Sequence, residues 1–228
     1  MAGRLQGKVC VITGAGGGMG RDAAILFTEE GARVCAADVN LAAAEETVGL
    51  CSGEAFAFQV DVADEGNVKA MMDATAERYG GIDVLYNNAG ISPDDDASIL
   101  DTSVDAWDRV QAVNTRGVFL CCKHGIPHLL ERGGGSVINV ASFVAILGAA
   151  TSQISYSASK GAVLSMSREL AVQFARQGVR VNALCPGPVE TPLLLNIFGD
   201  NPEALERRRI HWPTGRLAKP REIVNGAL

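Results

Sequence analysis

The chain has 228 residues, of which 47% are hydrophobic and 20% are charged, and its net charge at pH 7 is −6. This composition fits one globular α/β domain with a large core. The acidic balance argues against nucleic acid or an anionic membrane as the main partner. No apolar run reaches about 18 residues, so we expect no membrane span, and the chain runs directly into a strand without a signal peptide.

The cysteines and histidines do not predict a metal site. The six cysteines form no Cys-x-x-Cys pair, so zinc is not expected. Cys10, Cys35 and Cys185 fall within apolar runs, where a thiol behaves as a small buried hydrophobe. His124 and His128 are spaced as a surface or interface pair with no third ligand. We therefore expect a cytoplasmic protein with reduced thiols and no metal.

Short apolar runs alternate with longer amphipathic runs along the whole chain. The predicted strands are residues 8–13, 33–38, 55–60, 82–86, 135–140 and 179–184. The predicted helices are residues 19–30, 41–50 and 65–79, a long one within 104–130, and 155–176. Strands rich in Val, Ile and Ala without polar alternation are typical of a sheet buried on both faces. The order predicts a doubly wound parallel sheet in a three-layer α/β/α domain that spans residues 1–228.

A glycine-rich segment, residues 13–20 (TGAGGGMG), closes the first predicted strand and opens the first helix. Glycines allow a tight turn and the close approach of a diphosphate. The N-terminus of the helix offers N–H groups and a partial positive charge. In this strand–turn–helix context, with an acidic residue after the second strand, the pattern predicts dinucleotide binding.

Asp38 ends the second predicted strand, where a carboxylate can accept hydrogen bonds from both adenosine ribose hydroxyls. A 2′-phosphate would meet a like charge there, at a cost of about 1–4 kcal/mol. The three residues that follow, and Gly17, carry no charge. The sequence therefore favours NAD over NADP, although Arg21 and Arg33 lie near enough along the chain to reach a phosphate in principle.

Tyr156 and Lys160 lie four residues apart, so they share one face of the predicted helix. A free tyrosine has a pKa of about 10, and a neighbouring cation stabilises the phenolate and lowers that pKa. The pair is typical of a general acid/base unit. Ser142 lies shortly upstream, and together with the glycine-rich turn these residues predict an enzyme.

At this point the chain resembles a classical short-chain dehydrogenase/reductase, from about Leu5 to its last residue. Its motifs occur in the family's order, and they are Thr13-Gly14-(x)3-Gly18-x-Gly20, Asp61, Asn87-Asn88-Ala89-Gly90, Asn114, Ser142, Tyr156-(x)3-Lys160 and Pro186-Gly187. The resemblance implies a Rossmann-like fold and reversible hydride transfer between a nicotinamide and a secondary alcohol or ketone.

The resemblance also implies roles for single residues. The expected catalytic residues are Asn114, Ser142, Tyr156 and Lys160. The expected cofactor-binding residues are Gly14, Gly17, Gly18, Met19, Gly20, Asp38, Asp61, Val62, Asn88, Ala89, Gly90, Tyr156, Lys160, Pro186, Gly187, Val189 and Thr191. Tyr156 would exchange a proton with the substrate, and Ser142 would hydrogen-bond the substrate oxygen. Lys160 would lower the tyrosine pKa and bind the nicotinamide ribose, and Asn114 would hold a water that links Lys160 to solvent.

Several of these positions also fit a simpler interpretation on their own. Asp61 fits a cap for the following helix, and Asn114 fits a solvated helix position. The segment 186–191 reads as a turn. The acidic run 94–96 is interpreted as a polar loop rather than a metal site, and the basic run 207–209 as a solvated helix face rather than an anion-binding site.

The end of the chain departs from the family pattern. The family usually continues past residues 215–220 with a helix, a loop and a seventh strand, whereas this chain stops at Leu228, inside that helix. By resemblance the final strand is missing, and the chain reads as C-terminally truncated. The two long helices, within 104–130 and 155–176, correspond to a subunit interface of the family. They predict a homodimer or homotetramer.

The function that these features favour is an NAD(H)-dependent dehydrogenase or reductase for a small-molecule alcohol or ketone. One alternative is a 3-oxoacyl-acyl-carrier-protein reductase that uses NADPH, and another is a member that binds NAD without turnover. Trp212 lies in a region that resembles the family's substrate lid and is expected to wall the pocket. The other expected pocket residues are Ser92, Phe143, Val144, Ile146, Leu193 and Leu194, which indicate an apolar ligand of modest size.

Overall fold

The computed structural model describes residues 3–198 and 202–228. Six parallel strands form one sheet in the order β3-β2-β1-β4-β5-β6. The strands are β1 (Val9–Thr13), β2 (Arg33–Asp38), β3 (Ala55–Gln59), β4 (Val84–Asn87), β5 (Gly135–Val140) and β6 (Val179–Leu184). The sheet is wound outward from β1 in both directions, which creates a switch point between β1 and β4. The predicted doubly wound α/β fold is confirmed.

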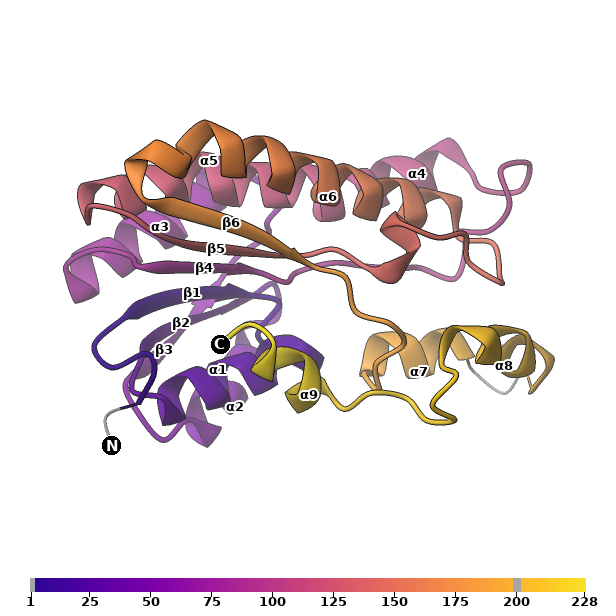
Figure 1. The fold of residues 1–228 in the computed structure, drawn as a ribbon, viewed down its shortest axis with the longest axis horizontal. Coiled ribbons are helices and arrows are strands. Elements are labelled where there is room, and N and C mark those ends of the chain that lie inside the picture. The colour runs from indigo at the N-terminus through magenta and orange to yellow at the C-terminus, as the bar shows by residue number, and fades with distance from the viewer. Residues whose placement is uncertain (1–2, 199–201) are drawn as a thin grey trace.

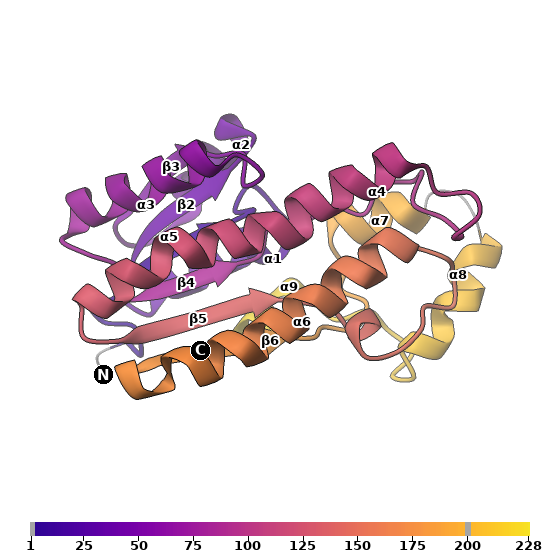
Figure 2. The ribbon, with the colours of Figure 1, turned by 90° about the horizontal axis from the view of Figure 1, so that it is seen from above.

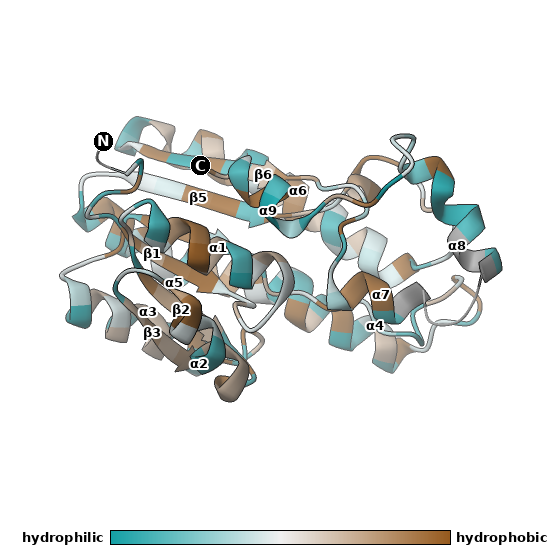
Figure 3. Cartoon of the chain, turned by 90° about the horizontal axis from the view of Figure 1, so that it is seen from below, coloured by the Kyte–Doolittle hydropathy of each residue, from teal (hydrophilic) through white to brown (hydrophobic). Residues whose placement is uncertain are grey.

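Helices cover both faces of the sheet. They are α1 (Gly18–Glu29), α2 (Leu41–Leu50), α3 (Glu65–Tyr79), α4 (Val104–Val110), α5 (Gly117–Glu131), α6 (Ile154–Phe174), α7 (Pro192–Phe198), α8 (Pro202–Arg208) and α9 (Pro220–Asn225). Helices α3 to α6 lie on one face, as Figure 2 shows from above, and α1, α2 and α9 lie on the other, as Figure 3 shows from below. Helices α7 and α8 lie beyond the carboxyl ends of the strands (Figure 1).

The central strands are buried as their sequences predict, but the last strand is not. Every residue of β1 and β4 is buried. In β6, by contrast, Val179 and Val181 are buried while Arg180 and Asn182 are exposed. β6 is one of the two edge strands of the described sheet, and this alternation shows that one of its faces is exposed, so the expectation of two buried faces is wrong there.

The predicted long helix within 104–130 is interrupted. A π-helical segment, Gln111–Arg116, lies between α4 and α5, and the three pieces form one continuous rod (Figure 2). Its wide turn is visible where Gly117 donates its N–H to the carbonyl of Ala112, five residues back. Such segments are frequent at functional sites, and this one contains Asn114. Among the described residues, no helix combines the length and apolar character needed to cross a membrane.

Candidate active site

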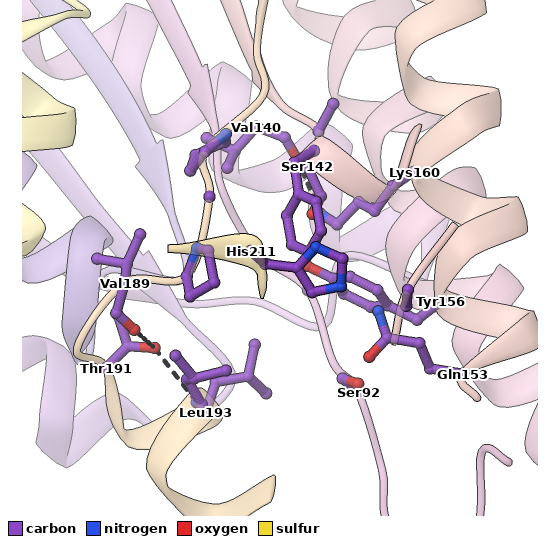
Figure 4. A pocket seen from close by; sticks show the side chains of 18 of the residues that line it. Ser92, Val140, Ser142, Gln153, Tyr156, Lys160, Val189, Thr191, Leu193 and His211 are labelled. Atoms are coloured by element: carbon purple, nitrogen blue, oxygen red, sulfur yellow. Dashed lines mark hydrogen bonds between the residues drawn. The ribbon is translucent and has the colours of Figure 1, made fainter. Parts of the chain in front are cut away.

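A pocket opens where the carboxyl ends of β4, β5 and β6 meet the segment that leads into α7 (Figures 1 and 4). The predicted site residues that line it are Met19, Asn88, Gly90, Ser142, Tyr156, Lys160, Pro186, Gly187, Val189 and Thr191. The predicted residues that do not line it are Gly14, Gly17, Gly18, Gly20, Asp38, Asp61, Val62, Ala89 and Asn114. Figure 4 shows Ser142, Tyr156 and Lys160 on one side and Val189 and Thr191 on the other.

The glycine-rich turn leaves no room for side chains on its inner side. Gly14 has a φ of +67°, and a Cβ there would lie 2.9 Å from the Cα of Ala89. A Cβ on Gly20 would lie 2.0 Å from the carbonyl oxygen of Gly14. On the outer side, Gly17 occupies the N-cap position of α1, provides no side-chain hydrogen bond and has open space around it. A helix N-terminus without a capping side chain and without an acidic residue in its first turn fits a diphosphate.

Asn88 and Thr13 hold the glycine-rich turn against the end of β4. The Thr13 hydroxyl oxygen accepts the N–H groups of Asn88 and Ala89, each at 3.2 Å. The Asn88 Nδ2 group donates to the carbonyl oxygens of Thr13 at 3.0 Å and Gly14 at 3.2 Å. These four bonds join the two strands that flank the switch point of the sheet.

Asp38 is oriented by the same turn. Its Oδ2 accepts the N–H of Gly16 at 2.8 Å, and its Oδ1 accepts the N–H of Asn40 at 2.9 Å. A Cβ on Gly16 would lie 2.9 Å from the Asp38 carboxylate, so glycine is required for this approach. A carboxylate has about four acceptor positions. Two therefore remain available for the hydroxyls of a ribose.

The two arginines near Asp38 in sequence are placed differently. The Arg21 guanidinium donates to the carbonyl of Gly16 at 2.6 Å and to the Thr47 hydroxyl at 3.0 Å. Arg33 begins β2, at the opposite end of the strand from Asp38, and its guanidinium lies 5.3 Å from the ring centroid of Tyr79. Arg33 is therefore not placed to reach a cofactor phosphate beside Asp38.

Asp61 and Val62 follow β3. Asp61 is exposed, and its carboxylate accepts the N–H of Ala63 at 2.9 Å. The cap of α3 is Asp64, whose side chain accepts the N–H of Asn67 at 2.7 Å. The interpretation of Asp61 as the helix cap is therefore wrong. Val62 is buried.

Lys160 lies between the end of β5 and the loop that follows β4. Its Nζ donates to the carbonyl oxygen of Val140 at 2.7 Å and lies 5.5 Å from the ring centroid of Tyr156. A Cβ on Gly90 would lie 3.4 Å from the same Nζ. Glycine at this position therefore leaves room for a ligand close to the Lys160 amine.

The environment shifts the pKa values of Tyr156 and Lys160. Burial raises the pKa of Tyr156, and a hydrogen bond with Ser142 acts in the opposite direction. Burial lowers the pKa of Lys160 from 10.5 to about 8. Among the described groups, the Ser142 hydrogen bond lowers the pKa of Tyr156 and burial outweighs that effect, while the lowering of this pKa by Lys160 stays a prediction.

Asn114 is fully buried rather than solvated, which corrects the simpler interpretation of this residue. Its Oδ1 accepts the N–H of Ile91 at 2.8 Å. Its Nδ2 donates to the carbonyl of Ile91 at 2.9 Å and to the Ser159 hydroxyl at 3.0 Å. Asn114 therefore joins the π segment to the loop after β4 and to α6.

Asp96 is a residue of the site that the sequence did not reveal. Its side chain is 6% exposed, and its two carboxylate oxygens accept the N–H groups of Ser155 at 2.9 Å and Tyr156 at 2.8 Å. The neighbouring Asp95 instead pairs with Arg109 at the surface. The run 94–96 is thus not a simple polar loop, since Asp96 anchors the first turn of α6. The described residues contain no group of three or more metal-ligating side chains.

The outer wall of the pocket is formed by the loop at 149–153 and the residues that follow α8. His211 accepts the N–H of Ala150 at its Nε2, at 2.9 Å, and its ring centroid lies 4.7 Å from that of Phe143. Burial, together with the charge of Arg208, lowers the pKa of His211. The Arg208 Nε donates to the hydroxyl of Thr151.

Two expectations about this wall are corrected. His211 lines the pocket, although the sequence gave it no role. Arg208 also lines it and is half-buried, whereas Arg207 and Arg209 are exposed as predicted. Trp212 lines the pocket, as expected.

The remaining pocket predictions are mostly confirmed. Ser92, Phe143, Leu193 and Leu194 line the pocket. Val144 and Ile146 do not, because Val144 is buried and Ile146 is 66% exposed.

Comparison with known proteins agrees with this architecture. A family model described as enoyl-(acyl carrier protein) reductase matches residues 14–228. A 2-(R)-hydroxypropyl-CoM dehydrogenase from Xanthobacter autotrophicus is 44% identical, over 97% of this chain and 90% of that protein. The chain belongs to the short-chain dehydrogenase/reductase family. Its members named here are oxidoreductases, and this chain is an enzyme of that class.

Two further members of the short-chain dehydrogenase/reductase family illustrate the likeness. A 3-oxoacyl-(acyl-carrier-protein) reductase from Thermotoga maritima is 39% identical, over 97% of this chain and 89% of that protein. The crystal structure of a 3-ketoacyl-(acyl-carrier-protein) reductase from Brucella melitensis, complexed with NADH, is 36% identical. It superimposes with a TM-score of 0.90, over 98% of this chain and 90% of that one.

Proposed function

We propose that this protein is an NAD(H)-dependent oxidoreductase that interconverts a secondary alcohol and a ketone. The observation that carries the proposal is the convergence of Ser142, Tyr156 and Lys160 on one pocket. That pocket also includes Met19, which follows the glycine-rich turn, and Gly90, beside the Lys160 amine.

The residues present divide the chemistry between them. In oxidation, the Tyr156 phenolate removes the proton of the substrate hydroxyl, and in reduction the phenol returns a proton to the same oxygen. Ser142 donates a hydrogen bond to that oxygen and stabilises the negative charge that develops on it. A nicotinamide cofactor, when bound, would supply the hydride chemistry at the carbinol carbon, as acceptor in oxidation and donor in reduction.

Lys160 and Asn114 support the proton transfer. The Lys160 amine, beside Gly90, is positioned to bond ribose hydroxyls of the cofactor. Its lowered pKa lets it exchange a proton near neutral pH. Asn114 belongs to the π segment, where the altered hydrogen-bond pattern favours a bound water that links Lys160 to solvent.

The remaining cofactor contacts follow the segments that border the pocket. The glycines at the start of α1 would hold the diphosphate, Asp61 and Val62 the adenine, and the segment 186–191 the carboxamide. Asp38 favours NAD, because its carboxylate faces the Gly16 N–H and would repel a 2′-phosphate. Arg21, which donates to the Gly16 carbonyl and the Thr47 hydroxyl, is already engaged.

A second candidate is a 3-oxoacyl-acyl-carrier-protein reductase. It is favoured by the name of the Thermotoga maritima relative, whereas the matching family model is described as an enoyl-(acyl carrier protein) reductase. Asp38 argues against the NADPH dependence expected for it. A member that binds NAD without turnover is the third candidate, and the clustered Ser142, Tyr156 and Lys160 argue against it.

We further propose a single nucleotide-binding domain that assembles as a homodimer or homotetramer in the cytoplasm. Support for assembly comes from the outer face of α5 and α6. There an apolar groove is lined by Phe119, Ile126, Met166, Leu170 and Phe174, among others.

Titration of the purified protein with NADH and with NADPH, followed by nicotinamide fluorescence, tests the cofactor assignment. We expect NADH to bind at least about tenfold more tightly, which corresponds to about 1.4 kcal/mol of repulsion at Asp38. Asp38→Asn should reduce the difference between the affinities for NADH and NADPH. Asp61→Asn, which removes a different carboxylate, is the matched control. Preference for NADPH in the unmodified protein would contradict the assignment of NAD as the cofactor and would favour the function of a 3-oxoacyl-acyl-carrier-protein reductase.

A further inference from the structure

The pocket has an unusual balance of charge. Among its lining residues that the structure describes, Lys160 and Arg208 are cationic and none is an aspartate or glutamate. Most of the others are apolar or small. A ligand that enters this pocket therefore meets positive charge at two places and negative side chains at none. Because the lining is largely apolar, those charges act through a medium less polarisable than water.

The position of Arg208 is fixed by the loop that leads into α6. Its Nε donates to the Thr151 hydroxyl, and the adjacent Ala150 N–H donates to His211 at 2.9 Å. These two contacts join the end of α8 and the turn after it to the same loop. A guanidinium that is half-buried and tied in this way loses little conformational entropy when a ligand binds.

Arg208 and the reacting groups come from different parts of the fold. Helix α8 lies at the outer end of the molecule, while Tyr156 belongs to the first turn of α6 and Ser142 follows β5 (Figures 1 and 2). Arg208 on one side and Ser142 and Tyr156 on the other all line the same pocket. A substrate whose reacting carbon lies at Ser142 and Tyr156 can therefore extend its other end toward the wall that contains Arg208.

We propose that the substrate of this enzyme carries an anionic group, a carboxylate or a sulfonate, and that Arg208 binds it. The proposal rests on the proposed function, because it names the substrate class of the same site. A guanidinium presents parallel N–H donors that match two oxygens of such an anion. Arg207 and Arg209 are exposed and do not line the pocket, so neither supplies this contact.

Binding measurements test the proposal without requiring turnover. Calorimetric titrations compare cyclohexanecarboxylate with cyclohexanecarboxamide, a neutral analogue of the same shape, with and without NADH. Cyclohexanesulfonate forms a third arm and separates the two kinds of anion. The proteins are the unmodified chain, Arg208→Gln, Arg208→Lys and the matched control Arg207→Gln, which removes the same charge from the exposed neighbouring position.

We expect the carboxylate or the sulfonate to bind the unmodified protein at least about tenfold more tightly than the amide, because one charge-assisted hydrogen-bonding contact contributes a difference of that size. Arg208→Gln should abolish that preference, Arg208→Lys should keep part of it, and Arg207→Gln should keep it all. The proposal is overturned if neither anion binds better than the amide at millimolar concentration, or if the preference survives in Arg208→Gln. If neither NADH nor NADPH binds while the anion preference persists, the proposed function fails and only the anion-binding role of Arg208 stands.

Discussion

The anchoring of α6 by Asp96 yields a quantitative prediction. The Asp96 carboxylate accepts two backbone N–H groups from the first turn of the helix that carries Tyr156. It is buried, so water cannot replace it readily. Loss of a helix cap costs about 0.5–2 kcal/mol, and a hydrogen bond to a charged group contributes about 1.5–3 kcal/mol. We therefore expect Asp96→Ala to lower the free energy of unfolding by about 3 kcal/mol.

Activity should fall together with stability, because one of the two donors is the N–H of Tyr156 itself. Small displacements of a catalytic group reduce rates strongly, and we expect kcat to fall at least about tenfold. Asp96→Asn, which keeps only one acceptor oxygen, should lie between the unmodified protein and Asp96→Ala. For a chain of this size, 3 kcal/mol corresponds to a decrease in Tm of about 6–12 °C.

Urea unfolding and steady-state turnover measure these effects, and Asp95→Ala provides the matched control. Asp95 is the adjacent carboxylate, and its ion pair with Arg109 is about half exposed on both sides. Such a pair contributes about 0–1 kcal/mol. If Asp96→Ala and Asp95→Ala unfold at the same urea concentration and turn over equally fast, the anchoring role of Asp96 is refuted.

Two further predictions concern the reacting groups. Ser142→Ala should lower kcat about 100-fold with little change in Tm, as loss of an oxyanion donor does; a decrease below threefold in initial rates would contradict this role. Lys160→Met should remove activity and yet raise the free energy of unfolding at pH 7 by about 2 kcal/mol. The lowered pKa of Lys160 means that burying its charge costs about 3 kcal/mol, and the hydrogen bond to the Val140 carbonyl offsets part of that cost. Lys160 loses its proton near pH 8 in the folded protein and near pH 10.5 in the unfolded chain, so the unmodified protein gains stability as the pH rises across that range. The stability advantage of Lys160→Met should therefore shrink. Thermal unfolding at pH 7 and pH 10 tests this, and an unchanged difference in Tm between Lys160→Met and the unmodified protein would contradict it.

Local sequence patterns predicted most of the fold. The strands at 33–38, 135–140 and 179–184 and the helices at 41–50 and 65–79 have the predicted bounds. The fourth strand begins two residues late, at Val84, because Asp83 bonds through its side chain to the N–H of Val9. Where a segment's structure depends on its own periodicity and turns, the sequence was sufficient.

The errors lie where partners are distant in the chain. Asp96 bonds the first turn of α6 across 59 and 60 residues, and His211 meets Ala150 across 61. No local pattern indicates such pairings. The π segment was missed for a related reason, since the contacts of Asn114 with Ile91 and Ser159 arise only in the folded chain. Burial also raises the pKa of Tyr156, an effect that opposes that of a nearby cation and cannot be read from spacing.

The measurement that tests the central claim most directly is the turnover of Tyr156→Phe, with NADH affinity measured on the same preparation. The substitution removes one oxygen from a partly buried ring and leaves the rest of the pocket in place. The account predicts a decrease in kcat of about 100-fold or more, because general acid/base catalysis is lost, with NADH binding within about twofold of the unmodified protein. Turnover within about threefold of the unmodified protein would contradict the assignment of Tyr156 as the proton-transferring residue.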